Sequence, residues 1–111
     1  MDAQAVARYC RTLKAANEGY PFGAGTLVFK VGGKIFAIMG EHSVSLKCDP
    51  HVALALRESY PAVTPGYHLN KRHWNTVALD GSVPDDELRD WLLDSYDLAV
   101  ASLTRSQRAG L

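Results

Sequence analysis

Residues 26–39 read Thr-Leu-Val-Phe-Lys-Val-Gly-Gly-Lys-Ile-Phe-Ala-Ile-Met. Two runs rich in β-branched and aromatic residues, 26–31 and 34–39, flank the pair Gly32 and Gly33. A two-glycine connection suits the primed turns of β-hairpins, because glycine reaches positive φ at little steric cost. The stretch therefore predicts two antiparallel strands joined by a tight turn.

Three more strands are expected outside this hairpin. Residues 43–48 alternate apolar and polar side chains with the period of a half-buried strand, and residues 74–79 form a β-rich run before the turn at Asp80 and Gly81. Residues 62–68 are expected to add one short strand. Since hairpin strands pair antiparallel, the strands together predict one antiparallel sheet.

Helices are expected before, between and after the strands. Apolar residues recur at helical spacing over residues 2–16, ahead of an irregular connection at 17–25 that holds three glycines and a proline. Asp49 followed by Pro50 predicts a helix start, because the carboxylate can accept an orphan N–H and proline loses nothing at the first helical position. The last helix begins at about residue 84, and acidic residues in its first turn suit the helix dipole.

These elements follow the order α-β-β-β-α-β-β-α along a single domain of residues 1–111. Amphipathic helices need a surface to pack on, so the order predicts an α+β two-layer sandwich, an antiparallel sheet with helices packed on one face. If Val77 and Leu79 point to the core, strand alternation sends a polar and aromatic set to the open face. The members of this set are Ser43, Ser45, Lys47, Trp74, Thr76 and Ala78.

The composition is typical of a globular chain that folds unaided. Hydrophobic residues make up 47% and charged residues 22%, and twelve basic residues balance twelve acidic ones. Zero net charge argues against a nucleic-acid or membrane binder that works by bulk charge. The distribution is uneven, because residues 26–76 carry six Lys or Arg against three acids and residues 77–97 carry one against seven. An acidic helix start with a solvated face explains the second excess equally well.

Cys10 and Cys48 are the only cysteines, which excludes a disulfide scaffold. The N-terminus lacks a basic start followed by an apolar run, and no stretch approaches the roughly 18 apolar residues of a membrane span. We therefore expect a cytoplasmic protein that does not associate with membranes. A buried structural role is expected for both thiols.

The chemically richest segment is residues 60–76, which read Tyr-Pro-Ala-Val-Thr-Pro-Gly-Tyr-His-Leu-Asn-Lys-Arg-His-Trp-Asn-Thr. Its Pro-Gly pair favours a turn that exposes the residues after it. Lys71, Arg72 and His73 can then donate to an anion, and Trp74 offers a ring for stacking. Contact with phosphates or bases is the functional interpretation. Packing of the indole in the core or at its rim is the structural alternative.

Metal binding and catalysis are not expected. His68 and His73 are five residues apart, a poorer spacing than four for one helix face. Cys48, Asp49 and His51 lie too close together around a helix start to complete a tetrahedral set. The chain has no G-x-S-x-G or Walker A pattern, and no acid within the histidine-rich segment orients a base. We therefore expect no metal, no cofactor and no enzymatic activity.

Over nearly its whole length the chain resembles the MmcQ/YjbR-like family, with matching runs in the same order and at similar intervals. These runs are Pro21-Phe22-Gly23, Val28-Phe29-Lys30-Val31, Gly33-Lys34-Ile35-Phe36-Ala37, Leu46-Lys47-Cys48-Asp49-Pro50, Pro65 through Val77, and Ser95-Tyr96. The His-x-Asn-Lys-x-His-Trp block at 68–74 is too long to arise readily by chance.

The resemblance implies an α+β fold similar to that of type III secretion chaperones and frataxin-like domains. It also implies DNA binding, since members are described as predicted DNA-binding proteins. With Arg72 of the same segment, the matched positions give the candidate nucleic-acid contacts Lys34, Lys47, His68, Asn70, Lys71, Arg72, His73, Trp74 and Asn75. Two alternatives stay open. One is an adaptor domain that recruits a protein partner to its open sheet face or a free edge, and the other is a small-ligand binder with a cavity bounded by His68, His73 and Trp74.

Overall fold

The hairpin predicted at residues 26–39 forms in the computed structural model, which describes residues 1–111. β2 (Val28–Val31) pairs antiparallel with β3 (Lys34–Met39). The connecting Gly32 and Gly33 have φ angles of 56° and 82°, in the left-handed region that favours glycine. The two-glycine turn thus closes the hairpin as the sequence predicts.

The hairpin contains a β-bulge that the alternation pattern does not reveal. Phe29 pairs with Ala37 and Lys30 with Ile35, so Phe36 is one extra residue in β3. Phe36 and Ala37 are consecutive, yet both are fully buried in the core. A bulge can turn two successive side chains toward one face, which a regular strand cannot do.

The hairpin belongs to a six-stranded antiparallel sheet with the order β1-β2-β3-β4-β6-β5. β4 (Ser43–Lys47) lies between β3 and β6 (Trp74–Ala78). The two edges are short strands, β1 (Asn17–Gly19) and β5 (Val63–Pro65). The predicted strands at 43–48, 62–68 and 74–79 are therefore present, although the second is shorter than its segment.

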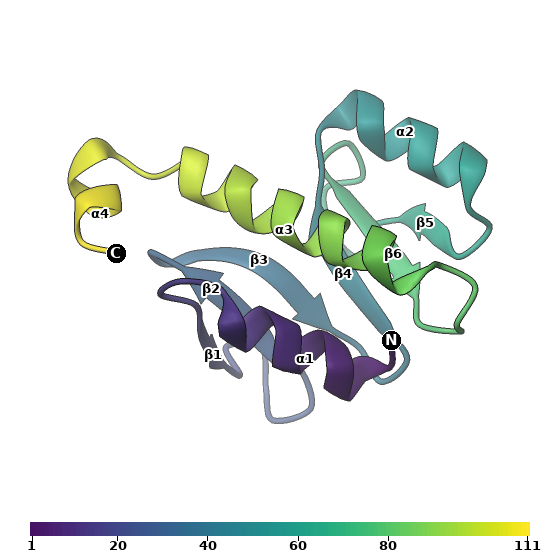
Figure 1. The fold of residues 1–111 in the computed structure, drawn as a ribbon, viewed down its shortest axis with the longest axis horizontal. Helices are drawn as coiled ribbons and strands as arrows, with labels where there is room; N and C mark the ends of the chain where they lie inside the picture. The colour runs from purple at the N-terminus through teal and green to yellow at the C-terminus, as the bar shows by residue number, and fades with distance from the viewer.

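Helices cover one face of this sheet (Figure 1). α3 (Asp85–Ala101) crosses β3 and β4, and α1 (Ala3–Thr12) lies beside it. α2 (Pro50–Ser59) lies against β5 and β6. The short helix α4 (Arg105–Ala109) ends the chain and lies away from the other helices. The Asp49 carboxylate accepts the backbone N–H groups of His51 and Val52 at 3.0 and 3.4 Å, which is the predicted cap. No helix combines the length and the apolar character needed to span a membrane.

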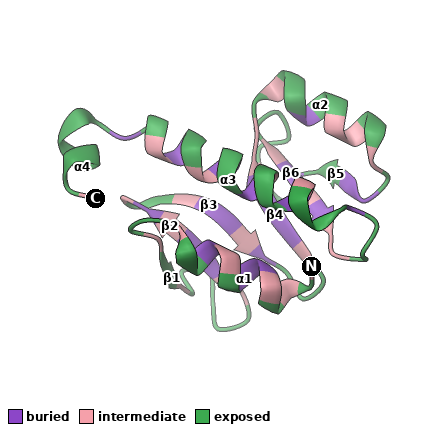
Figure 2. Ribbon diagram, viewed as in Figure 1, coloured by how far each residue is buried: buried purple, intermediate pink, exposed green.

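The core lies between the sheet and the helices, and the opposite face has no helix over it (Figure 2). Val44 pairs with Val77 on the buried side. On the helix-free side the register pairs are Ser43 with Ala78, Ser45 with Thr76 and Lys47 with Trp74. The α+β two-layer architecture and its open face are confirmed.

The N-terminal helix ends four residues earlier than the spacing predicts. Leu13 has an extended backbone and Ala15 a φ of 60°, so the chain turns back to form β1 within the connection expected to be irregular. Pairing with β2 gives residues 17–19 ladder hydrogen bonds, and Arg11 forms a salt bridge with Glu18 at 2.6 Å. Tertiary pairing here outweighs the helix propensity of Lys14 and its alanine neighbours.

Candidate nucleic-acid interface

Loop 66–73 joins β5 to β6 and is built from short-range hydrogen bonds. The N–H of Gly66 donates to the carbonyl of Trp74 at 2.9 Å, which closes the base of the loop. The Asn70 side chain accepts the N–H of Arg72 at 2.9 Å, and the Asn70 carbonyl accepts the N–H of Trp74 at 2.9 Å. Asn70 therefore organises the turn that presents Lys71, Arg72 and His73, a common role for this residue type.

An arginine of α2 fastens this loop to the rest of the molecule. The Arg57 Nε donates to the Asn75 side-chain oxygen at 2.7 Å, and its Nη2 donates to the carbonyls of Lys71 and Trp74. Asn75 in turn donates to the carbonyl of Ala53 at 3.3 Å. These hydrogen bonds connect α2 to β6 and to loop 66–73. The sequence did not predict them, because there Arg57 is only one of six cations in residues 26–76.

Asn75 is a correction to the expected site. It lies on the helix-facing side of β6, opposite Leu46, and is 2% exposed. A side chain buried there cannot reach a ligand on the open face. Strand alternation explains why Asn75 is buried, because its neighbours Trp74 and Thr76 both point to the open face. Its role is to hold Arg57 and the end of α2.

Lys71, Arg72 and His73 are exposed at the tip of loop 66–73. None of them forms a salt bridge, since the ion pairs of the molecule join Met1 to Asp85, Arg11 to Glu18 and Glu41 to His42. Lys71 and Arg72 also line a notch of about 390 Å³ with Arg57 and His51, where Asp49 is the one acid. The cations around this notch therefore outnumber its one acid, and none of them forms an ion pair with it.

Lys47 and Trp74 extend this surface onto the open face. They are direct partners in the β4–β6 ladder, and both side chains are half-buried. The indole therefore neither enters the core nor stands free. A lysine and a tryptophan on paired positions of neighbouring strands suit a phosphate next to a stacked base.

Lys34 does not join this group. It begins β3 at the tip of the hairpin, where it pairs with Val31, and β4 separates β3 from β6. In Figure 1 the start of β3 lies well apart from β6. The other lysine of the candidate set, Lys47, is the one that the sheet register places beside loop 66–73.

A groove opens on the helix-free face between two loops, and we name it the sheet groove. Its floor is the register row Ile38, Ser45 and Thr76, and its volume is about 450 Å³. The remaining lining residues come mainly from loop 66–73, from the segment 20–27 and from the β3–β4 turn. They are Phe22, Thr26, Met39, Gly40, Ser43, Tyr67, His68 and Leu69.

The sheet groove differs from the cavity expected for a small-ligand binder. Of His68, His73 and Trp74, only His68 lines it. Tyr67 and Phe22 were missed, although both stand next to glycines or prolines in the matching family runs, where loops present side chains to solvent. Their exposed fractions are 73% and 62%, unusually high for large aromatic residues.

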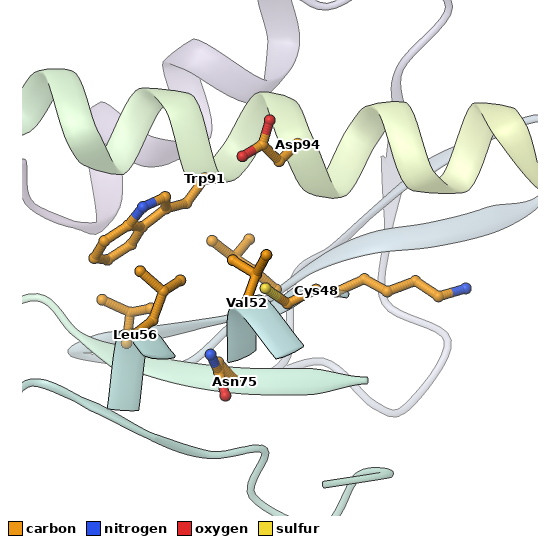
Figure 3. A pocket seen from close by; sticks show the side chains of 9 residues that line it. Cys48, Val52, Leu56, Asn75, Trp91 and Asp94 are labelled. Carbon is orange, nitrogen blue, oxygen red and sulfur yellow. The ribbon is translucent and has the colours of Figure 1, made fainter. Parts of the chain in front are cut away.

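A second hollow lies on the opposite side of the sheet, between α2 and α3 (Figure 3). Leu46 and Val77 form its floor, and Trp91 and Leu56 line one end. Its inner part holds about 20 Å³, roughly the space of one water molecule. This inner part is therefore too small for an organic ligand.

Cys48 lines this α2–α3 hollow, with its thiol directed inward (Figure 3). Burial raises the pKa of Cys48, and the charges of Asp49 and Asp94 raise it further. Burial likewise raises the pKa of Asp94, with added repulsion from Asp90 and Asp97. A thiol held protonated is a poor nucleophile, so the hollow lacks the electropositive surroundings of a reactive cysteine.

Titratable groups elsewhere do not gather into a further site. No group of three or more His, Cys, Asp or Glu side chains could hold a metal ion. The imidazoles of His68 and His73 form no ion pair with a carboxylate. Cys10 is fully buried, and burial raises its pKa to about 12. The basic tip and the sheet groove are therefore the main chemical features of the surface.

Comparison with known proteins identifies the family to which this chain belongs. A family model described as YjbR matches residues 11–98, and the chain belongs to the YjbR family. It is 36% identical over 105 residues to the uncharacterized protein YjbR of Escherichia coli K12, covering 91% of this chain and 89% of that protein. It is 40% identical over 90 residues to the uncharacterized protein YbdF of Escherichia coli O157:H7, covering 78% and 74%.

Solved structures show the same architecture. A Deinococcus radiodurans protein with a DUF419 domain superposes with a TM-score of 0.90 at 37% identity, covering 98% of this chain and 86% of that one. A Pseudomonas syringae protein superposes with a TM-score of 0.78 at 26% identity, covering 89% and 99%. The expected family is confirmed. The names of these relatives describe no activity, so function has to be argued from the surface.

Proposed function

We propose that this protein binds DNA through loop 66–73 and the helix-free face of its sheet, in a binding rather than a catalytic role. The observation that carries the proposal is the pair Lys71 and Arg72, exposed and without an acidic partner at the edge of that face. A charge left unpaired in the folded protein is available to a phosphate without first breaking an ion pair.

The ladder pair Lys47 and Trp74 supports the same interface. Phosphate contacts supply most of the affinity of such proteins, while rings and base edges add orientation and preference. Because Lys47 and Trp74 adjoin the loop, one strand of nucleic acid can contact the tip and the open face together. The acids of residues 85–97 lie on α3, which covers the opposite face of the sheet from the helix-free one. Asp94 is the acid of this helix that comes nearest to a proposed contact, since it lines the α2–α3 hollow together with Lys47.

The adaptor alternative finds less support at the edges of the sheet. Addition of a partner strand needs a run of free N–H and C=O groups. Both edge strands, β1 and β5, are three residues long, and β5 ends in a proline. A cytoplasmic location also forms part of the proposal, and it suits the two free thiols of Cys10 and Cys48.

Binding of labelled DNA as a function of salt tests this function. We expect fluorescence anisotropy to detect binding at about 50 mM salt and a linear fall of log K with log salt. The double variant Lys71→Ala/Arg72→Ala should weaken binding and reduce the slope by about 1.4 to 1.8, the loss of two phosphate contacts. Single strands and duplexes should both be measured.

The matched control is Arg105→Ala/Arg108→Ala. It removes the same charge from two exposed positions of α4, which lies far from β6 (Figure 1). We expect this control to bind nearly as the unmodified protein does. The proposal would be overturned if neither DNA form bound at low salt, or if the affinity did not depend on salt. It would also be overturned if the two double variants lost the same DNA affinity.

A further inference from the structure

The sheet groove has a fixed shape, because one of its loop walls is attached to its floor. The Thr76 hydroxyl accepts the N–H of Tyr67 at 3.0 Å and shares a hydrogen bond of 2.8 Å with the Ser45 hydroxyl. Ser45, although on the helix-free face, is 8% exposed. The start of loop 66–73 therefore sits against the sheet, and the groove beside it is part of the fold.

The walls of the groove present aromatic rings that are largely free. The Tyr67 and His68 rings lie with their centroids 4.0 Å apart, and neither ring contacts any other aromatic side chain. Phe22 lines the same groove from the segment 20–27. His68 has a φ of 57°, a left-handed conformation that costs energy in a residue other than glycine. Exposed rings beside a strained backbone are features that cluster at ligand sites.

The groove also offers polar groups to a flat ligand. Beside the paired hydroxyls of Ser45 and Thr76, the Ser43 hydroxyl makes no hydrogen bond within the protein. Ile38 supplies an apolar patch in the same row. An apolar surface with a few hydroxyls and ring walls matches a nucleobase, which combines two π faces with an edge of donors and acceptors.

We infer that the sheet groove binds one unstacked base of single-stranded DNA, packed against Tyr67 and His68, while the flanking phosphates lie toward Lys47 and loop 66–73. The inference rests on the proposed DNA binding and specifies that the bound DNA is single-stranded. Lys47 and Trp74 form the next outward-facing pair of β4 and β6 after Ser45 and Thr76, which lie in the groove floor. The positive charge of Lys47 is therefore placed at one end of the groove. A duplex keeps its bases stacked and paired, so it cannot fill the groove.

Anisotropy with a labelled 12-nucleotide strand and with its duplex tests the inference at low salt. We expect the single strand to bind about tenfold more tightly, the scale of one base stacked on an aromatic side chain. Tyr67→Ala should lose most of this preference, and Tyr67→Phe should keep it. Tyr20→Ala is the matched control, because Tyr20 is an accessible tyrosine of segment 20–27 that does not line the groove.

The outcomes separate the base site from the general function. Equal affinities for strand and duplex, with Tyr67→Ala unchanged and Lys71→Ala/Arg72→Ala still weakened, would overturn the base site and leave DNA binding standing. No binding of either form would overturn both. Tighter binding of an RNA strand of the same sequence would overturn the assignment to DNA. Because Tyr67 is 73% exposed, its replacement should not prevent folding.

Discussion

Ser95 shows how one side chain can complete a sheet. The paired residues of β3 and β4 end at Ala37 and Leu46, and the Ser95 hydroxyl connects the two strands one residue beyond that pair. It donates to the carbonyl of Phe36 at 2.6 Å and accepts the N–H of Lys47 at 2.9 Å. The hydroxyl is fully buried, and no buried side-chain polar atom in the molecule lacks a partner. A hydroxyl on α3 therefore joins the two layers at the bulge.

Ser95→Ala should destabilise the protein by about 1–3 kcal/mol, because it leaves the buried carbonyl of Phe36 and the half-buried N–H of Lys47 without their partner. Urea unfolding measures this change. Ser102→Ala is the control, since Ser102 follows the same helix, is exposed and donates only to the carbonyl of Ala99. A loss for Ser95→Ala no larger than that of the control would show that the bridge between β3 and β4 is energetically unimportant.

At the scale of elements, the approach of β5 to β6 sets where loop 66–73 leaves the sheet. Gly66 is buried at the end of β5, and a Cβ added there would lie 2.7 Å from the Cβ of Trp74 and 3.0 Å from its carbonyl oxygen. The contact is with backbone and with the root of a side chain, which cannot move aside independently. The absence of a side chain at residue 66 therefore allows the loop to close over Trp74.

Gly66→Ala should destabilise the protein by about 1–3 kcal/mol through this overpacking. Gly25→Ala is the matched control, because a Cβ there meets nothing within 4 Å and Gly25 has no positive φ. The control should be unchanged or more stable by up to about 1 kcal/mol. Thermal or urea unfolding measures the stabilities of the two variants. Equal stabilities would contradict the role given to Gly66.

Across the whole molecule, charge is separated between two layers. Loop 66–73 and the open face carry cations without acidic partners, while α3 carries six acids and one arginine on the opposite layer. The net charge is zero, so any attraction of an anion depends on its approach from the basic side. The helix layer acts against DNA at long range, and salt reduces that repulsion.

Asp90→Asn/Asp97→Asn should therefore raise DNA affinity about twofold to threefold at low salt, by weakening a distant repulsion. Both residues are exposed and make no hydrogen bond or salt bridge through their side chains. The gain should disappear at about 300 mM salt, where the Debye length is about 6 Å. A gain that persists there would indicate that the acids lie in the binding surface itself.

Local signals were enough to predict the hairpin, the Asp49 cap, the two-layer architecture and the outward set on β4 and β6. Each depends on neighbours in sequence: glycines between β-rich runs, a capping carboxylate before proline, and strict alternation. The same local reasoning extended the first helix too far and missed β1, because pairing with β2 is a contact between distant segments. It also placed Asn75 among the contacts when alternation alone argued against that.

The sequence by itself determined the family, the class of fold and the segment in which aromatic and cationic residues concentrate, since these depend on residue types in order along the chain. Tertiary structure alone decided that Arg57 holds loop 66–73 and that Ser95 connects β3 to β4. It alone also decided that Phe22 and Tyr67 line a single groove over Ser45 and Thr76. The physical reason is that burial, hydrogen-bond partners and grooves arise between residues far apart in sequence, and no local pattern encodes their approach.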